Sequence, residues 1–413
     1  MIANAWTAGR DNPTSKHQIA LKLAEQGHRV LWVEGAGMRR PSLAAGEDRG
    51  RILRKIRMAT RGARRAAAGD AAHDAEHAAP DSSGGVWVLS PLLLPLPSVG
   101  LVRRFNGWLY RVLALRWAAR LGFDSPVLIN YVPVLAEAMR GWPGRTVYHC
   151  VDRWDRFEMY DSELMSRTDE RCCRLADVVI ASSRDLYDRC RERHPDVRLV
   201  NHGVDYEHFS APLRDDGPGA SGAPEDLPEG PIVGFFGLLS EWVDQDLLVG
   251  LARELPGCRL VLIGRADVPV DRLRREENIV LTGPKPFAEL PPYVSRFDAG
   301  VIPFVVNELT VAVNPVKLRE MLAAGCPVIS TALPEVAECG AARAGIGAVV
   351  TARNAEEFVA RVRERLDAPL TWEQKRSISA LVRGETWEAK VREIVGIVGE
   401  APTQPDGGKN DGR

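Results

Sequence analysis

The residues best suited to bind a charged ligand lie at the start of one predicted helix. From Asn314 to Thr331 the chain reads Asn-Pro-Val-Lys-Leu-Arg-Glu-Met-Leu-Ala-Ala-Gly-Cys-Pro-Val-Ile-Ser-Thr. Asn314 suits the N-cap, Pro315 suits the first helical position, and Gly325 suits the helix end before a short buried strand. Because free backbone N–H groups and the positive end of the helix dipole meet at such a start, it favours a phosphate.

Two of the charged side chains in the first turns of that helix suit a ligand. Lys317 places a positive charge beside the predicted phosphate. Glu320 is three residues further on, on the same face of the helix, where it can accept hydrogen bonds from a pair of sugar hydroxyls. The alternative is an ordinary capped helix with a lysine–glutamate pair on its surface.

Glycines at predicted strand ends support a ligand site in the same half of the chain. A strand predicted over 232–236 runs into Gly237 and Leu238, and another ends in Gly264 and Arg265. A glycine lets a bound group approach the backbone closely, and an arginine can grip a diphosphate. Together with the helix start, these strand ends predict one ligand-binding edge.

The first half of the chain contains candidate residues for binding and activating an acceptor hydroxyl. Asp152 follows a strand predicted over 146–150 and suits a general base for an acceptor hydroxyl, the alternative being a loop aspartate that caps a turn. Ser15, Lys16 and His17 enter the first predicted helix and form either a second, acceptor-side anion site or a simple cap.

Two other motifs are set aside. The stretch 217–222 matches Gly-x-Gly-x-x-Gly, but it follows no predicted strand and contains a proline, so it is not a dinucleotide site. Asp244 and Asp246 fit a helix start better than a metal site. No histidine pair has zinc spacing, and we expect no metal and no cofactor.

Composition limits the class of protein. A chain of 413 residues favours two domains, and 45% hydrophobic with 26% charged residues is typical of globular proteins. The net charge of −1 gives no indication of nucleic-acid binding, and no apolar run approaches the roughly 20 residues that span a bilayer. Seven irregularly spaced cysteines and the lack of a signal-peptide pattern predict a cytoplasmic protein.

Strand-like and helix-like segments alternate in both halves, which predicts two doubly wound α/β domains with a cleft between them. The predicted strands are 29–33, 86–89, 127–130, 146–150, 178–181, 198–200, 232–236, 259–263, 279–282, 299–303 and 327–331. The predicted helices are 16–26, 103–121, 160–175, 184–193, 244–254, 288–296, 315–324 and 355–366.

Three segments fall outside this alternation. Residues 211–230 have the composition of a linker. An insertion over about 46–85 begins with a basic stretch, 49–65, predicted as an amphipathic helix that either contacts an anionic membrane leaflet or lies on the surface as a solvated helix. We predict disorder in the alanine-rich remainder, about 66–85, and in the tail 401–413.

Three motifs together carry a family resemblance. Asn201–Phe209 is similar to an inter-domain signature written N-G-V-D-x-x-x-F, with His202 inserted. Gly234–Gly237 is similar to a strand that ends in a glycine loop. Asn314–Thr331 is similar to a donor-binding helix. Over nearly its whole length the chain resembles nucleotide-sugar glycosyltransferases of the GT-B fold, most closely the family 4 branch of bacterial cell-surface polysaccharide synthesis.

The resemblance implies two Rossmann-like domains facing across a cleft: an acceptor-side domain over 1–210, a donor domain over 231–385 and a helix over 386–400 that crosses back. It implies a metal-independent hexosyltransferase that moves a sugar from a nucleoside diphosphate to a lipid-linked or polysaccharide acceptor, in the cytoplasm or at the inner face of the membrane. The expected donor-binding residues are Gly237, Leu238, Arg265, Asn314, Pro315, Lys317 and Glu320.

Two departures from the family pattern keep other functions open. Ala312 stands where the family has the first glutamate of a Glu-x7-Glu pair, and Glu241–Asp244 stand where an arginine and a lysine are usual. Lys317 is expected to supply the missing positive charge. Donor identity and the choice between retention and inversion stay open, as do an epimerase or hydrolase and a non-catalytic protein that binds a partner or a lipid surface.

Overall fold

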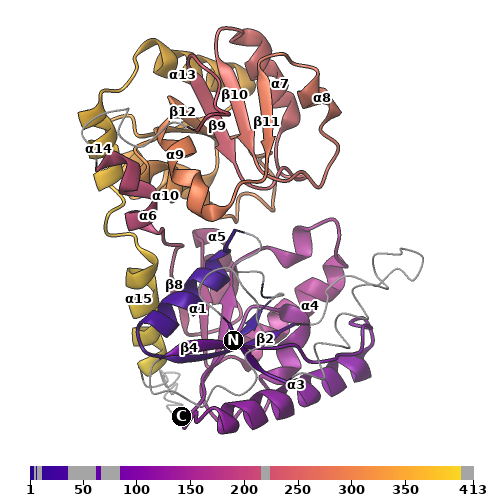
Figure 1. Ribbon diagram of the computed structural model, residues 1–413. Coiled ribbons are helices and arrows are strands. Elements are labelled where there is room, and N and C mark those ends of the chain that lie inside the picture. The colour runs from indigo at the N-terminus through magenta and orange to yellow at the C-terminus, as the bar shows by residue number, and fades with distance from the viewer. Residues whose placement is uncertain (4–5, 7–11, 36–61, 67–83, 215–223, 401–413) are drawn as a thin grey trace, which may run out of the picture. The chain divides into compact units, whose positions relative to one another are not determined.

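The computed structural model describes residues 1–3, 6, 12–35, 62–66, 84–214 and 224–400. The chain forms two compact units, one made of Met1–Asn201 with the residues from Val391 on, and one made of His202–Lys390 (Figure 1). Residues 202–210, expected in the first domain, therefore belong with the second unit. No helix among the described residues is long and apolar enough to cross a membrane.

The first unit contains an eight-stranded sheet in the order β3-β4-β2-β1-β5-β6-β7-β8, parallel except where β3 pairs with β4. Its strands are buried almost throughout, as expected where helices cover a parallel sheet. They are β1 Ile2–Ala3, β2 Arg29–Glu34, β3 Arg64–Arg65, β4 Gly85–Leu89, β5 Leu128–Asn130, β6 Thr146–Cys150, β7 Val178–Ala181 and β8 Val197–Leu199.

Two helices of the first unit start at side-chain caps, and α3 is tied to the sheet by a hydrogen bond. The Asp161 and Ser183 side chains cap α4 and α5 by accepting from backbone N–H groups. The Tyr110 hydroxyl of α3 donates to the Val33 carbonyl of β2 at 2.9 Å. The helices are α1 Ser15–Glu25, α3 Gly100–Arg120, η1 Pro133–Ala138, η2 Trp154–Arg156, α4 Ser162–Leu175, α5 Arg184–Arg191 and the later part of α15 Trp387–Gly399.

The second unit contains a six-stranded parallel sheet in the order β11-β10-β9-β12-β13-β14. The first strand in sequence, β9, lies between β10 and β12, so the direction of winding reverses between β9 and β12. The strands are β9 Ile232–Phe236, β10 Arg259–Ile263, β11 Ile279–Gly283, β12 Ala299–Ile302, β13 Val328–Thr331 and β14 Val349–Ala352.

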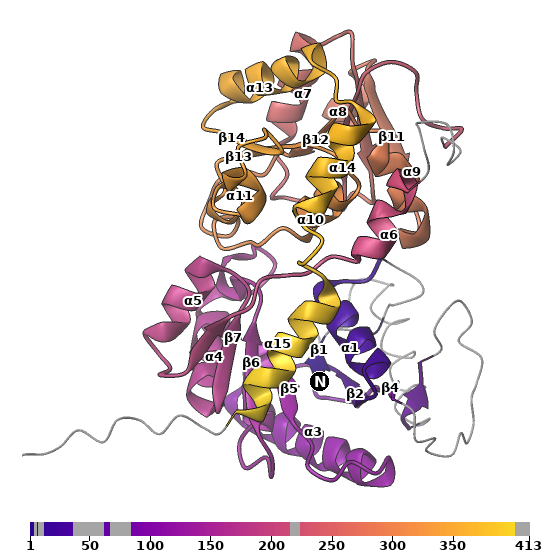
Figure 2. The ribbon, with the colours of Figure 1, turned by 90° about the vertical axis from the view of Figure 1, so that its left-hand side faces the viewer.

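Two groups of helices pack on this sheet (Figure 2). Helix α7 contacts α8 and α13, whereas α10 contacts α6 and α14. The helices are α6 Tyr206–Ser210, η3 Ala211–Leu213, α7 Gln245–Glu254, α8 Asp271–Arg274, η4 Phe287–Glu289, α9 Leu290–Ser295, α10 Val316–Ala323, α11 Pro334–Ala337, α12 Gly340–Arg343, α13 Ala355–Asp367 and α14 Trp372–Ala380.

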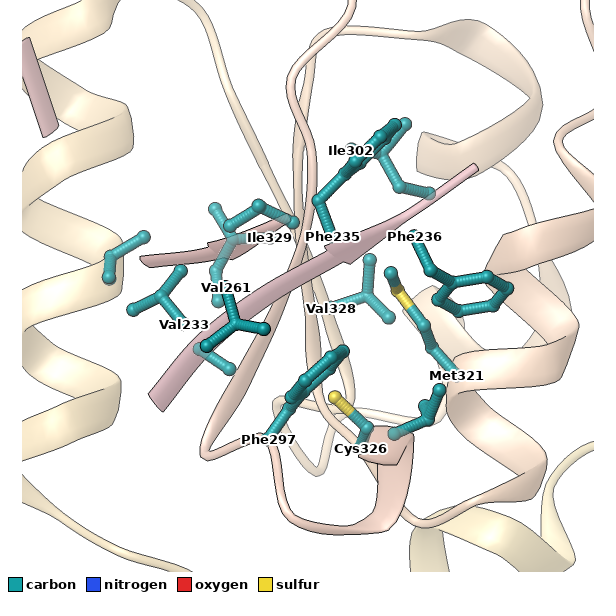
Figure 3. Packing of buried hydrophobic residues seen from close by; sticks show 14 of the residues in the cluster. Val233, Phe235, Phe236, Val261, Phe297, Ile302, Met321, Cys326, Val328 and Ile329 are labelled. Carbon is teal, nitrogen blue, oxygen red and sulfur yellow. The ribbon is translucent and has the colours of Figure 1, made fainter. Parts of the chain in front are cut away.

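Glycines on the central strands bring bulky side chains close to the sheet (Figure 3). A Cβ on Gly234 of β9 would stand 2.1 Å from the ring of Phe297, and a Cβ on Gly300 of β12 would stand 2.7 Å from the sulfur of Met321. Both neighbouring side chains are fully buried. The contact of Met321 with Gly300 packs α10 closely against β12.

The segment 201–209 lies against the start of α15. The Val204 N–H donates to the Glu385 carbonyl at 2.9 Å, and a Cβ on Gly203 would stand 2.7 Å from the Trp387 nitrogen. Asp205 then caps α6 by accepting from the His208 N–H. The expected helix over 386–400 is confirmed as α15, whose residues from Val391 on group with the first unit.

Most expected elements are confirmed within one to three residues, but some expectations differ. The strand β14 and the helix α14 were not predicted. Arg64 and Arg65, expected to end a basic helix, instead form β3, because their backbone pairs with Trp87 and Val88. The rest of that helix, the alanine-rich insertion apart from its ends, most of the predicted linker and the tail lie outside the described residues.

Candidate functional site

Three glycines leave bare backbone at one edge of the second sheet. Gly237, Gly264 and Gly283 stand at the ends of β9, β10 and β11 with φ values of +134°, +151° and +73°. The Gly264 N–H donates to the Gly283 carbonyl at 2.9 Å, and a Cβ on Gly264 would stand 1.8 Å from the Gly237 oxygen. Only glycine fits at position 264, because the backbone of Gly237 occupies the space that a side chain would need.

Lys317 reaches this edge from the first turn of α10. Its Nζ lies 5.0 Å from the ring centroid of Phe235 in β9 and 4.7 Å from that of Phe304, which follows β12. A Cβ on Gly237 would stand 3.0 Å from the same Nζ. The ammonium group is thus held at the point where the winding of the sheet reverses, which is where doubly wound sheets bind their ligands.

Burial shifts the pKa values of Lys317 and Glu320, both on α10, toward neutral pH. Burial lowers the pKa of Lys317 to about 8, although the charge of Glu320 acts to raise it. Burial raises the pKa of Glu320 to about 7; Lys317 opposes this shift and Asp205 adds to it. A lysine and a glutamate that both titrate near neutral pH on one helix are typical of functional sites.

The start of α10 differs from the prediction. Pro315, not Asn314, is the N-cap, and no side-chain hydrogen bond caps the helix within the described chain. The Asn314 amide instead donates to Glu335 at 2.5 Å, and its oxygen accepts from Arg319 at 2.8 Å. The N-cap assignment of Asn314 and the first-position assignment of Pro315 are therefore wrong, because a buried guanidinium takes the Asn314 oxygen that a cap would need.

Arg319 anchors this region. Its side chain is buried, and its Nε donates to Glu385 at 2.5 Å, so it ties α10 both to Asn314 and to the segment that precedes α15. Sequence reasoning did not identify Arg319, Glu335 or Glu385. The available signal was an arginine among the apolar residues on the buried side of the helix, and buried arginines require partners.

The other donor-side predictions fall on the same edge. Arg265 follows Gly264 with an exposed side chain, and its carbonyl accepts from the Leu239 N–H at 2.9 Å, which holds the Gly237–Leu238 turn beside it. Ala312 is buried. Separately, Asp244 caps α7 by accepting from the Leu247 N–H at 2.9 Å, as expected from the sequence.

In the first unit, the charges of Asp152 and Lys16 act on each other. Asp152 follows β6, and burial raises its pKa to about 6 while the charge of Lys16 opposes the shift. Burial in turn lowers the pKa of Lys16, and Asp152 opposes that shift. The Lys16 Nζ lies 4.8 Å from the ring centroid of Trp154 and 5.8 Å from that of Tyr131. Two of the predicted acceptor-side residues, Lys16 and Asp152, are thus close enough to affect each other's pKa.

His17 is engaged in packing and capping. Its ring stacks on Trp32 with centroids 4.9 Å apart, and its Nδ1 accepts from the Thr14 backbone N–H at 3.2 Å. Thr14 is the N-cap of α1, with Ser15 in the first turn. The side chain of Lys16 is therefore the charged group that this helix start places beside Asp152.

Solved structures share this architecture. Sucrose-phosphate synthase from Thermosynechococcus elongatus superposes with a TM-score of 0.63 at 17% identity, covering 92% of this chain and 91% of that one. HepE from Anabaena in complex with UDP superposes with a TM-score of 0.59 at 14% identity, covering 96% and 97%. The fold is GT-B.

Sequence comparisons agree with the GT-B fold. Residues 230–368, which contain the whole glycine edge and α10, match the family described as glycosyl transferases group 1. The putative teichuronic acid biosynthesis glycosyltransferase TuaH of Bacillus subtilis is 27% identical over 224 residues, which are 49% of this chain and 54% of TuaH. The chain spans about half the length of this curated relative. The predicted resemblance to GT-B glycosyltransferases is confirmed.

Proposed function

We propose that the protein transfers a hexose from a nucleoside diphosphate to a lipid-linked or polysaccharide acceptor during synthesis of a cell-surface polysaccharide. The observation that carries the proposal is the Lys317 ammonium held over bare Gly237 backbone at the reversal point of the second sheet. HepE, which shares the fold, has been solved with UDP and with UDP-glucose, and TuaH is named for teichuronic acid synthesis. The HepE complexes support a nucleotide-sugar donor, and the name of TuaH supports a role in polysaccharide synthesis.

In this proposal the diphosphate lies at the start of α10. The backbone N–H groups there, the Lys317 ammonium and the Arg265 guanidinium hold its oxygens. Glu320, about one turn further along α10 than Lys317, accepts hydrogen bonds from ribose or sugar hydroxyls. As the bond between the sugar and the diphosphate breaks, these fixed donors stabilise the charge on the departing diphosphate. The charge can be balanced by these groups, so we propose that turnover needs no metal.

Asp152 is proposed as the general base for the acceptor. With a pKa of about 6 it is ionised at neutral pH, yet it is more basic than an ordinary aspartate and better matched to proton transfer. Lys16 keeps this carboxylate charged in its buried surroundings. The acceptor hydroxyl would give its proton to Asp152 as its oxygen bonds to the anomeric carbon of the sugar.

Product analysis tests the proposal. The purified full chain is incubated with radiolabelled UDP-, GDP-, ADP- and TDP-hexoses, with and without a lipid-linked saccharide acceptor and with EDTA present throughout. The proposal predicts transfer of one hexose to the acceptor and no reaction in its absence. Release or epimerisation of the sugar without acceptor would indicate a hydrolase or an epimerase, and binding without turnover would indicate a non-catalytic protein; each would contradict the proposal.

A further inference from the structure

A group of buried charged side chains lies beside the turn that carries Asp152. Asp155 belongs to η2 in this turn, three residues after Asp152, and Asp169 belongs to α4. The Asp155 and Asp169 side chains are 7% and 4% exposed. Both face Arg189 of α5, whose side chain is 14% exposed. We call Asp155, Asp169 and Arg189 the Arg189 bridge.

Arg189 contacts both aspartates of the bridge at once. Its Nη1 donates to Asp155 Oδ1 at 3.2 Å, and its Nη2 lies 3.3 Å from Asp169 Oδ2. A guanidinium can hold two carboxylates in this way because its N–H groups form a rigid planar fork. The Arg189 bridge therefore ties η2, which follows β6, to both α4 and α5.

The charges around the bridge keep Asp155 ionised. Burial acts to raise the pKa of Asp155, but the hydrogen bond from Arg153 and the charges of Arg189 and Arg153 bring it below its ordinary value. Burial raises the pKa of Asp169, although the charge of Arg189 and the hydrogen bond from the Tyr148 hydroxyl oppose this shift. Asp155 is thus a carboxylate at neutral pH and keeps its pairing with Arg189.

Two other arginines pair with Asp155 but belong to the same turn. Arg153 donates to Asp155 at 3.0 and 3.1 Å, and Arg156 lies 3.6 Å from it. Arg189, by contrast, is 34 residues away in the sequence. Arg153 also lies 3.8 Å from Asp185 of α5, whose side chain is 36% exposed. Of these two contacts between the turn and α5, the pair of Arg189 and Asp155 is the shorter and the more buried.

Asp152 depends on its neighbours in the chain for its position. Before it, the Ser182 hydroxyl donates to the Val151 carbonyl at 3.3 Å. After it, Asp155 is held by the Arg189 bridge. Within the described part of the chain no hydrogen bond reaches the Asp152 carboxylate, on which Lys16 acts through its charge. The contacts on either side of Asp152 therefore set where its carboxylate lies.

We propose that Arg189 is a positioning residue, which holds η2 against α4 and α5 and thereby fixes the Asp152 carboxylate relative to the Lys16 ammonium. The same turn places the Trp154 ring 4.8 Å from the Lys16 Nζ, so one anchor sets both contacts of the lysine. A buried ion pair adds little net stability compared with apolar residues of similar volume, so a role in fixing geometry suits it better. This role rests on the proposed function in so far as Asp152 acts as the base.

Carbon-13 NMR of the full chain tests the position of Asp152 without any turnover. Aspartate carboxyl groups are labelled, and the Asp152 signal is assigned by its loss in Asp152→Asn. The wild type should titrate with the pKa of about 6 that burial causes. In Arg189→Met this pKa should fall toward the ordinary value of 3.8, because a released turn exposes the carboxylate to water. The charge that acts on Asp152 is that of Lys16, so the fall would report movement of the turn.

Arg193→Met is the matched control. Arg193 donates to Asp169 at 3.2 Å, much as Arg189 does, but within the described chain it does not contact Asp155. Both single variants should lose stability, since each removes a partner of a buried carboxylate. Only Arg189→Met should move the titration of Asp152. The double variant Arg189→Met/Asp155→Asn removes the unpaired charge together with the pair, so it should fold well and show the same fall in pKa.

Transferase assays add a second readout. Arg189→Met should lower kcat at least about tenfold, since small displacements of a reacting group are costly. It should leave the Kd for nucleotide unchanged, because the proposed donor residues lie in the other unit. Arg189→Lys, which keeps the charge, should recover part of kcat.

The two readouts separate the positioning role from the proposed function. An unchanged titration of Asp152 in the folded Arg189 variants, or an equal fall in Arg193→Met, would overturn the positioning role. A shifted titration with unchanged kcat would support the positioning role and exclude Asp152 as the base. If the wild type has no transferase activity, the proposed function fails and the NMR titration alone decides whether Arg189 positions Asp152.

Discussion

Lys317 lies directly against Gly237: a Cβ on that glycine would stand 3.0 Å from both the Cε and the Nζ of the lysine. Lys317 belongs to a helix start and Gly237 to a strand end. The contact therefore places the ammonium group beside backbone that carries no side chain. The glycine also has a φ of +134°, which disfavours any side chain. The position of the ammonium thus depends on the absence of a side chain at residue 237.

Gly237→Ala should weaken nucleotide binding, because the new methyl group displaces the end of Lys317. We expect at least a fivefold rise in Kd, roughly 1 kcal/mol, measured by calorimetry with the nucleotide that the wild type binds. Gly345→Ala is the control, since Gly345 also has a positive φ, +71°, but a Cβ there would meet nothing within 4 Å. Equal Kd values for the two variants would show that the contact with Lys317 is unimportant.

The pH dependence of kcat/KM should be bell-shaped. Asp152 and Glu320 act ionised in the proposal, with pKa values of about 6 and about 7, so activity should fall as the pH drops through this range. Lys317 acts protonated, with a pKa of about 8, so activity should fall again above that pH. Lys317→Arg should move the alkaline limb upward, because a guanidinium stays charged. An alkaline limb that does not move would exclude Lys317 as its source.

Asp152→Asn should lower kcat by roughly two to four powers of ten, the usual contribution of a general base, and leave the Kd for nucleotide unchanged. Steady-state assays and calorimetry separate the two effects. Asp188→Asn, at an exposed carboxylate that pairs with Arg184 on α5, is the control and should behave as wild type. Turnover by Asp152→Asn at the wild-type rate would remove Asp152 as the base.

Glu320 should reduce stability at alkaline pH. Its folded-state pKa, about 7, lies above the ordinary value of 4.5, so the native state binds the proton more tightly than the unfolded state. The free energy of unfolding should therefore decline as the pH rises from about 4.5 to about 7. Glu320→Gln should be more stable than wild type at pH 8, by roughly 1–3 kcal/mol, with a smaller difference at pH 5.

Urea unfolding at the two pH values measures this effect. Glu364→Gln replaces a glutamate of α13 whose side chain is 63% exposed and should leave the difference between pH 5 and pH 8 as in the wild type. A Glu320→Gln variant that is less stable than wild type at pH 8 would show that the ionised carboxylate stabilises the fold. In that case its pairing with Lys317 would outweigh its burial.

The sequence predicts those features that depend on local patterns. Runs of apolar residues between turn signals located the strands β6, β7, β9 and β10 at their observed bounds. Gly325 has the positive φ, +73°, that a helix end requires. The edge formed by Gly237 and Gly264 follows from parallel strands, whose carboxyl ends meet on one side.

Contacts between distant residues could not be predicted in this way. Asn314 has a strong local preference for an N-cap, but Arg319 and Glu335 compete for its side chain, and Glu335 is 21 residues away. The charges of Lys16 and Asp152 act on each other although the two residues are far apart in the sequence, and no spacing pattern relates them. Such tertiary partners override local propensity.

The most direct test of the account is calorimetric titration with UDP, GDP, ADP and TDP in the absence of metal. We predict that one of these nucleotides binds the wild type and that Lys317→Met raises its Kd at least about tenfold, because a charge-assisted hydrogen bond is lost. Lys285→Met, at a partly buried lysine paired with Asp226, should bind as the wild type does. Binding of no nucleotide, or equal affinity in a folded Lys317→Met variant, would contradict the proposed donor site.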